Sequence, residues 1–297
     1  KVCGHALPGR LKRFEIMKIL KDTFSVMRMA RLLEVSRSGF YSHLKSENKG
    51  PDPVESWLII ELKRLYDLHE RCYGLRRLWD ALKDEGYAFS RLTVARAMKK
   101  AGISGKKRKK FRVCTTDSNH SFPISPNLLK RNFHAAAPNK VWVSDITQVR
   151  AGSRWLYLCT IEDLFSRRIV GWSMKAHMET SLVTNALEMA TLQRGIHAGL
   201  IFHSDRGSQY ASHEFRQVLG RYGFLSSMSR RGNCWDNACA ESFFASMKKE
   251  LNCRSFGSVK DARNRIFNYI ELFYNRRRKH SYLGNLSPEQ FEMQKVA

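Results

Sequence analysis

The chain has 297 residues, of which 43% are hydrophobic, and it carries a formal net charge of +25 with an isoelectric point near 10.1. It contains no apolar run near the roughly 18 residues of a membrane span and shows no signal peptide, so we expect a soluble, cytoplasmic protein. A positive charge of this size favours a polyanion through counterion release. We therefore expect a nucleic acid as partner, ahead of a ribosomal or membrane-surface role.

The N-terminal part, residues 1–50, contains two helical patterns. The first runs from Phe24 to Leu33 and the second from Arg37 to Leu44, with Ser36 placed to cap the second helix. Such a pair is typical of a helix-turn-helix, in which the second helix enters the major groove of DNA. An ordinary helical hairpin has the same pattern and stays open as an alternative. The candidate DNA contacts are Arg37, Ser38, Tyr41, Ser42 and Lys45.

A second helical unit is expected at residues 54–104, after a polar linker broken by Gly and Pro. It contains three helical patterns, of which the third is capped by Ser90 and stops near Gly102. Its basic side chains predict a second DNA-contacting surface. The strongest candidates are Arg76 and Arg77.

Residues 105–139 are expected to connect this unit to the rest of the chain. They open with the basic run GKKRKKFR, which includes Lys107 and Arg108, and continue with a polar stretch that contains three prolines. A basic run of this kind is usually a solvated linker. Because it joins two units that we expect to contact DNA, we favour an arm that follows the phosphates.

Residues 140–252 predict an α/β domain. Three strand patterns in succession, followed by alternating helices and strands, favour a mixed five-stranded sheet flanked by helices. The expected strands are 141–149, 155–162, 167–174, 200–205 and 225–229, and the expected helices are 181–194, 212–222 and 237–252.

Residues 253–297 predict a C-terminal helical extension. Ser258 opens a helix, with Asp261 in the position of the usual capping-box glutamate. This helix runs into the basic cluster 276–280 beside Tyr274 and Tyr282, which could grip phosphate or stack on a displaced base. Favourable interaction with a helix dipole explains the individual arginines equally well. The named DNA-contact candidates here are Arg276 and Arg277.

Three acidic residues, Asp145, Asp205 and Glu241, stand in contexts that predict catalysis. Asp145 shares an apolar strand face with Val141 and Val143, where a carboxylate is costly unless it is paired or binds a cation. Asp205 directly follows a short apolar strand, and ligands of α/β sheets gather at strand ends. Each acid alone could be a turn former or a solvated surface charge. Together the three favour a catalytic site.

Carboxylates from two strands and a helix suit divalent metal. Mg²⁺ prefers oxygen ligands and takes one or two carboxylates per ion, with water and substrate phosphate completing its shell. Two such ions can activate an attacking oxygen and stabilise the leaving one in a phosphoryl transfer. We therefore expect Asp145, Asp205 and Glu241 to bind two Mg²⁺ ions, with Mn²⁺ as a substitute. Lys248, two turns beyond Glu241, is expected to contact a DNA phosphate.

Most of the chain resembles the downstream-reading-frame (OrfB) transposases of bacterial insertion sequences, which have a retroviral-integrase-like DDE core. The resemblance rests on long strings, among them YGLRRLWDALKDEGY, PNKVWVSDITQVR, HSDRGSQY, SMSRRGNCWDNACAESFFASMKKE and YNRRRKHSYLGNLSPEQF. It implies an RNase H-like fold, metal binding by Asp145, Asp205 and Glu241, and a DNA contact for Lys248. It also implies a bacterial, nucleoid-associated protein.

The expected activity is therefore sequence-directed DNA transposition. In this interpretation the enzyme nicks the element end and the released 3′-hydroxyl attacks a second phosphodiester. The expected partners are the terminal inverted repeats, target DNA, further copies of the chain on DNA, and an upstream-frame product or fusion segment, because the sequence has no sustained leucine heptad. Two rival functions stay open, a nuclease that stops at hydrolysis and a DNA-binding repressor.

Overall fold

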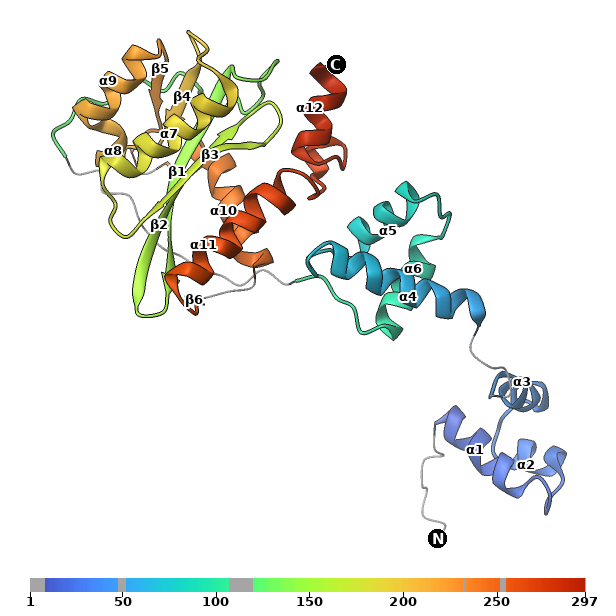
Figure 1. The fold of residues 1–297 in the computed structure, drawn as a ribbon. Helices are drawn as coiled ribbons and strands as arrows, with labels where there is room; N and C mark the ends of the chain where they lie inside the picture. The colour runs from blue at the N-terminus through green and yellow to red at the C-terminus, as the bar shows by residue number, and fades with distance from the viewer. Residues whose placement is uncertain (1–8, 48–51, 107–119, 232, 252–254, 297) are drawn as a thin grey trace. The chain divides into compact units, whose positions relative to one another are not determined.

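The structure, a computed structural model, describes residues 9–47, 52–106, 120–231, 233–251 and 255–296 (Figure 1). The chain divides into two compact units, residues 1–61 and 62–297. The boundary between them falls within helix α4 (Pro53–Leu68).

The first unit contains a small core made by three short helices. The two expected helices are present, and the Oγ atom of Ser36 accepts a hydrogen bond of 3.1 Å from the backbone N–H of Gly39, which confirms the predicted cap. An additional helix precedes them. The sequence pattern missed it because only Phe14 and Met17 are buried among its residues, too few for an amphipathic stripe. The helices are α1 (Arg10–Leu20), α2 (Val26–Leu32) and α3 (Arg37–Glu47).

The second unit begins with the remainder of α4 and two further helices, α5 (Leu75–Asp84) and α6 (Arg91–Lys100). The predicted cap of α6 is confirmed, because the Ser90 side chain accepts a hydrogen bond of 3.1 Å from the Thr93 N–H. Leu78 and Val94 are fully buried between these helices and their surroundings. The three helices expected for this part of the sequence are therefore all present.

A mixed sheet forms the centre of the second unit. Its strand order is β3-β2-β1-β4-β5, in which β1 pairs antiparallel with β2 and parallel with β4. This confirms the predicted five-stranded mixed sheet. A short sixth strand, which was not expected, pairs parallel with the far end of β1. The strands are β1 (Val141–Ala151), β2 (Arg154–Asp163), β3 (Ile169–Lys175), β4 (Ile201–Ser204), β5 (Leu225–Met228) and β6 (Ser255–Phe256).

Helices cover both faces of this sheet (Figure 1). Side chains on one face of β1, such as Trp142 and Ile146, pack in a core with α7 and α9. Side chains on the other face, Val141 and Val143, pack with Ala240 of α10. The period-2 pattern of β1 therefore assigns its side chains correctly, and it directs Asp145 to the α10 face. The helices are α7 (Thr180–Arg194), α8 (Ser208–Ala211), α9 (His213–Arg221) and α10 (Ala238–Glu250).

Two expected helices differ in detail from the structure. The helix expected at 212–222 is preceded by the separate turn of α8, and the one expected at 237–252 starts with a 3₁₀ turn at Cys234–Asn237. Asn237 holds the N-cap position but makes no capping hydrogen bond. Its side chain donates instead to the backbone carbonyl of Ser144 on β1, at 3.2 Å. A bond to the neighbouring strand thus replaces the local cap.

The C-terminal part continues with α11 (Val259–Phe267), which passes directly into a π-helical turn at Asn268–Tyr274. The predicted start is confirmed, because the Ser258 Oγ atom accepts a hydrogen bond of 3.1 Å from the Asp261 N–H. A short 3₁₀ turn at Ser281–Leu283 and helix α12 (Pro288–Val296) complete the described chain.

Close packing of β3 against α7 generates a stability prediction. A Cβ atom on Gly171 would lie 2.3 Å from the carbonyl oxygen of Ala186 and 2.8 Å from the Cβ atom of Ala190. Gly171→Ala should therefore lower the free energy of unfolding by about 1–3 kcal/mol, because the helix must move outward. The control is Gly220→Ala in α9, where an added Cβ meets nothing within 4 Å. Thermal denaturation of both variants checks this, and equal melting temperatures would contradict it.

Candidate active site

The register of two parallel strands brings Asp145 and Asp205 together. Val143 of β1 is paired with His203 of β4. Because β1 and β4 run in parallel, continuing this register by two residues places Asp145 beside Asp205. The sheet therefore holds two carboxylates at adjacent positions, one within β1 and one directly after β4.

Hydrogen bonds to the backbone orient both carboxylates. The Asp145 Oδ1 atom accepts from the N–H of Ile146 at 2.8 Å, and the Asp205 Oδ1 atom accepts from the N–H of Gly207 at 2.9 Å. Burial raises the pKa of Asp145 well above its ordinary value, and the negative charges of Asp205 and Glu241 raise it further. The Ile146 N–H and the Lys248 ammonium oppose this rise without cancelling it. The site thus concentrates negative charge.

Helix α10 brings Glu241 and Lys248 to the same face of the sheet. Glu241 is an exposed residue of the first turn, and partial burial of its carboxylate raises its pKa. Lys248 is half-buried and its Nζ atom donates to the Oγ1 atom of Thr147 at 2.6 Å. Burial lowers the pKa of Lys248, although the neighbouring Asp145 carboxylate works against this. Because Thr147 shares a strand face with Asp145, Lys248 contributes positive charge next to the acids.

A buried carboxylate, Asp236, anchors the loop that leads into α10. Both its oxygens accept hydrogen bonds from Arg230, at 2.9 Å each, and one also accepts from Arg131 at 2.9 Å. These bonds, above all those from Arg230, hold the pKa of Asp236 well below its ordinary value although burial works in the opposite direction. The Asp236 backbone carbonyl lies 3.0 Å from the Nε2 atom of the buried His203. The start of the Glu241 helix is therefore fastened to β4.

Sequence reasoning did not single out Thr147 or Asp236 as parts of the site. Thr147 has the strand-face periodicity of Asp145, so that signal was available. No local pattern distinguishes Asp236 from the other acids of the sequence, because its arginine partner Arg131 lies 105 residues away.

Comparison with known proteins agrees with this geometry. The Integrase core domain family matches residues 135–234 and, in a second description, residues 222–288, while the HTH-like domain family matches residues 55–111. Transposase InsF for insertion sequence IS3A of Escherichia coli (strain K12) is 40% identical over 281 residues, covering 92% of this chain and 96% of that protein. The chain belongs to the IS3-type insertion-sequence transposases.

A further relative is consistent with this membership. The Shigella sonnei "Insertion element IS600 uncharacterized 31 kDa protein" is 42% identical over 264 residues, 89% of this chain and 97% of that one. The HTLV-2 integrase catalytic core domain, solved in complex with magnesium in a trimeric form, covers 53% of this chain and 98% of its own with 17% identity and a TM-score of 0.41, a likeness too loose to assign anything. The predicted family, the fold class and an enzyme of the DDE polynucleotidyl transferase type are confirmed.

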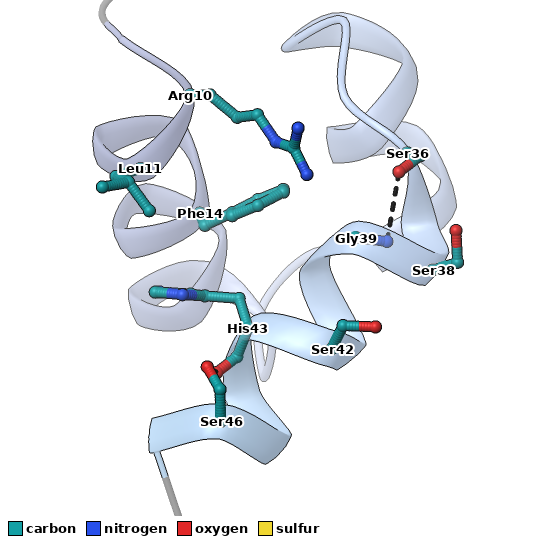
Figure 2. Close-up of a pocket in the computed structure, with 9 residues that line it drawn as sticks. All are labelled: Arg10, Leu11, Phe14, Ser36, Ser38, Gly39, Ser42, His43 and Ser46. Atoms are coloured by element: carbon teal, nitrogen blue, oxygen red, sulfur yellow. Dashed lines mark hydrogen bonds between the residues drawn. The ribbon is translucent and has the colours of Figure 1, made fainter. Parts of the chain in front are cut away.

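The DNA-contact candidates of the first unit lie on α3. Arg37, Tyr41 and Lys45 are all exposed, and the Arg37 guanidinium approaches the Met27 sulfur at 3.8 Å. A neighbouring pocket lies between α1 and α3 (Figure 2). Its lining is rich in hydroxyl groups and includes Arg10, whose guanidinium carbon lies 5.5 Å from the centre of the Phe14 ring. The α3 surface is thus polar and accessible within this unit.

The DNA-contact candidates in residues 62–297 fall into two groups, those that are exposed and those that are paired with a carboxylate. Arg76, Arg276 and Arg277 are exposed, whereas Arg77 is directed to the carboxylate of Glu250, at 3.2 Å. The rest of the expected basic cluster is not a phosphate grip, because Arg278 and Lys279 are buried against Glu250 and Asp84. Tyr274 is buried as well, so it cannot stack on a displaced base. Lys107 and Arg108 lie outside the described residues.

Within the described ranges, no three His, Cys, Asp or Glu side chains are grouped closely enough to hold a metal ion by themselves. In the same part of the chain, no helix has the length and apolar character needed to cross a membrane.

The charge concentration at Asp145 generates a stability prediction. A carboxyl group whose pKa is raised by folding favours the folded state at low pH, and this contribution is lost as the pH rises through the raised pKa. At neutral pH, Asp145→Asn should therefore raise the free energy of unfolding by about 1 kcal/mol and the melting temperature by about 2–4 °C. Added Mg²⁺ should stabilise the wild-type chain more than the variant, because it binds the folded state.

Thermal denaturation with and without Mg²⁺ measures both effects. The exposed Asp22→Asn substitution serves as the matched control, because it removes the same charge far from the site in sequence. A variant at Asp145 that melts below wild type in the absence of metal would contradict the prediction.

Proposed function

We propose that this transposase cuts a phosphodiester bond at the end of its insertion element and then joins the released 3′-hydroxyl to DNA. In the first step a water oxygen forms a bond to phosphorus while the 3′-oxygen leaves with a proton. In the second step that 3′-oxygen attacks another phosphodiester and displaces a second 3′-oxygen. Each step exchanges one P–O bond for another, so neither requires ATP or a covalent enzyme intermediate.

The placement of Asp145 next to Asp205 is the observation that carries this proposal. Two acids side by side in register, one within β1 and one directly after β4, repel each other, and burial increases the cost. Folding would not retain such a pair for stability alone. Strained or unfavourable arrangements of this kind are concentrated at functional sites, where a ligand relieves them.

The acid residues fit divalent metal by the chemistry of their donors. Asp145, Asp205 and Glu241 offer only oxygen atoms, and burial, together with the charges of the other two acids, raises the pKa of Asp145 well above its ordinary value. Hard cations such as Mg²⁺ or Mn²⁺ prefer these donors. We propose that the three residues hold two such ions, which when bound supply Lewis-acid polarisation of the reacting oxygens.

The chain's own residues fix the remaining features of the site. The strand register sets the positions of Asp145 and Asp205, and the Gly207 N–H limits the rotation of the Asp205 carboxylate. Lys248 supplies a positive charge on the face of the acids and would bind a phosphate oxygen of the DNA strand. Preorganised charges of this kind stabilise the charge that develops on a reacting phosphate.

We propose that the remaining parts of the transposase act on DNA. The division into residues 1–50 and 54–104 as DNA-binding units, 105–139 as a connection, 140–252 as the catalytic part and 253–297 as a basic extension is our assignment. The HTH-like family match at residues 55–111 supports the assignment of residues 54–104 as a DNA-binding unit. The proposed substrates are the terminal inverted repeats and target DNA, with several copies of the chain, and an upstream-frame product, assembled on them.

Substitution of the acids tests this function. Asp145→Asn, Asp205→Asn and Glu241→Gln should each reduce both cutting and joining by at least about 10³-fold, because each removes a proposed metal ligand. Binding to the same DNA should stay within about twofold of wild type, since no acid contacts the DNA backbone directly. The measurement uses labelled duplexes that carry the element end, with Mg²⁺ or Mn²⁺, and separates hydrolysis products from joined products.

The outcome also separates the rival functions. A nuclease would produce nicks and no joined product, and a repressor would bind the duplex without either product. Any acid whose substitution leaves joining near the wild-type rate does not belong to the site.

Substitution of Lys248 tests its proposed phosphate contact. Lys248→Ala should reduce joining about tenfold, the effect of losing one charge-assisted hydrogen bond, and should lower the salt dependence of DNA binding by about one unit of slope. Lys249→Ala is the matched control, because it removes the same charge from the next position of α10. Lys248→Glu adds repulsion and should be worse. A fully active Lys248→Glu chain would show that this face of α10 does not meet DNA.

A further inference from the structure

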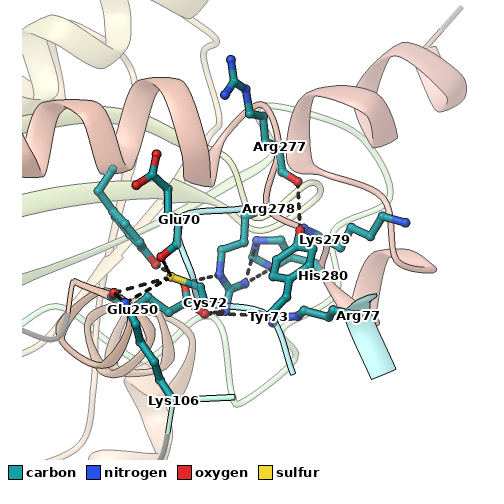
Figure 3. Close-up of polar contacts among 11 residues, drawn as sticks. Glu70, Cys72, Tyr73, Arg77, Lys106, Glu250, Arg277, Arg278, Lys279 and His280 are labelled. Carbon is teal, nitrogen blue, oxygen red and sulfur yellow. Dashed lines mark hydrogen bonds and ion pairs between the residues drawn. The ribbon is translucent and has the colours of Figure 1, made fainter. Parts of the chain in front are cut away.

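The last residue of α10, Glu250, lies at the centre of a buried polar cluster (Figure 3). Its carboxylate accepts two hydrogen bonds from Arg278, at 2.7 and 2.9 Å, and one from the hydroxyl of Tyr269 at 2.8 Å. Arg77 of α5 completes the set at 3.2 Å. Burial alone would raise the pKa of Glu250, but the bonds from Arg278 reverse this and hold the pKa below its ordinary value. The carboxylate is therefore ionised and fully paired.

The backbone at the end of α10 is held from the same side. The backbone carbonyl of Glu250 accepts hydrogen bonds from the Cys72 thiol, at 3.5 Å, and from the ammonium group of Lys106. Cys72 precedes α5 and Lys106 follows α6, so both contacts come from the helical segment at residues 62–106. An unpaired carbonyl at a helix C-terminus is thereby satisfied by groups distant in sequence.

Tyr73 connects the same helical segment to the chain after the π-helical turn. Its hydroxyl donates to the backbone carbonyl of Arg277 at 3.1 Å and accepts from the backbone N–H of Lys279 at 2.8 Å. The Lys279 ammonium group, in turn, pairs with Asp84 at the end of α5. Figure 3 shows the Arg278 side chain reaching into this cluster beside Tyr73, whereas the side chains of Arg277 and Lys279 point away from it. Three parts of the chain therefore meet at Glu250.

Arg77 is directed into the protein, unlike its neighbour Arg76. Arg76 is exposed, whereas the Arg77 guanidinium is mostly buried, lies 5.4 Å from the centre of the Tyr73 ring and points to Glu250. Two adjacent arginines on a helix lie about 100° apart, so one can face solvent while the other faces the protein. The Glu250 carboxylate partly cancels the field of the Arg77 guanidinium, which makes Arg77 a weaker partner for a DNA phosphate than the exposed Arg76.

We propose that Arg77 and Glu250 are positioning residues, whose ion pair fastens the helical segment 62–106 to the end of α10 and thereby sets the orientation of Glu241 and Lys248. This inference rests on the proposed function, because it assumes that those two side chains act at the cleavage site. Arg278 already balances the charge of Glu250. Arg77 therefore contributes a link between the helical segment 62–106 and the end of α10. Small displacements of catalytic groups cost large factors in rate.

The test compares Arg77→Met with Arg76→Met in the full chain. We expect Arg77→Met to slow single-turnover cutting of a labelled element-end duplex, at saturating protein, by about ten- to a hundredfold. The salt slope of DNA binding should stay at the wild-type value, whereas loss of a phosphate contact would lower it by about 0.9. Arg76→Met should cut at nearly the wild-type rate at saturation. A lowered slope with an unchanged saturating rate for Arg77→Met overturns the proposal.

A double-variant cycle and hydrogen exchange provide independent readouts. Adding Arg77→Met to Glu250→Gln should slow cutting by no more than about twofold further if Arg77 acts through Glu250, whereas fully multiplicative effects overturn the proposal. If Glu250→Gln does not fold, amide hydrogen exchange of the two arginine variants tests the proposal instead. Residues 245–250 should exchange faster in Arg77→Met than in Arg76→Met, and equal rates overturn the proposal. A wild-type chain that does not cut DNA contradicts the proposed function instead, while the exchange result still tests the ion pair.

Discussion

Parallel pairing of β1 with β4 is the constraint on which the site depends. The pairing of Val143 with His203 fixes the register of the two strands, and it places two acids side by side. Backbone hydrogen bonds hold this register, so mutual repulsion of the carboxylates cannot separate them. The energy of the sheet thus holds two carboxylates close together against their mutual repulsion.

Helix α10 must then hold its residues against this sheet, and buried carboxylates fasten it at both ends. Asp236 precedes the helix and is bound by Arg230 and Arg131, while Glu250 ends it and is bound by Arg278. Between them, the buried stripe of Ala240, Phe243, Phe244 and Met247 packs the helix onto its neighbours. Apolar packing favours close contact but permits sliding, whereas directional ion pairs at the two ends define one axial position.

The direction of the pKa shift separates two uses of buried acids in this protein. Arginines lower the pKa of Asp236 and of Glu250, so these carboxylates stabilise the folded chain as ionised partners. The pKa of Asp145 is raised, because burial and neighbouring acids outweigh the single ammonium of Lys248. Pairing is typical of a structural role, and unrelieved charge is typical of a binding site. The same residue type in the same domain therefore has opposite functions, determined by what surrounds it.

Local patterns allowed much of this architecture to be predicted, and long-range pairs account for what could not be. The alternation in β1 and the caps at Ser90 and Ser258 are properties of a few adjacent residues, and the structure contains each of them. The burial of Arg278 depends on Glu250, and the bond of Arg77 to that carboxylate joins positions 173 residues apart. No periodicity encodes such a contact, so the sequence leaves a DNA surface and a capped helix end equally open for the basic cluster 276–280.

Net charge is a poor measure of DNA-binding surface for the same reason. Arg131 and Arg230 are half-exposed, yet both are bound to Asp236, and Arg168 and Arg194 are bound to Glu292. A nearby carboxylate weakens the field of each of these arginines, although two carboxylates cannot neutralise four guanidinium groups. The formal charge of +25 records only the sum of all charges and not where they lie. The cations most accessible to a polyanion are those on exposed helix faces, such as Arg37 and Lys45 on α3 and Arg76 on α5. Only the three-dimensional pairing distinguishes these two populations, and it assigns adjacent arginines, Arg76 and Arg77, to different ones.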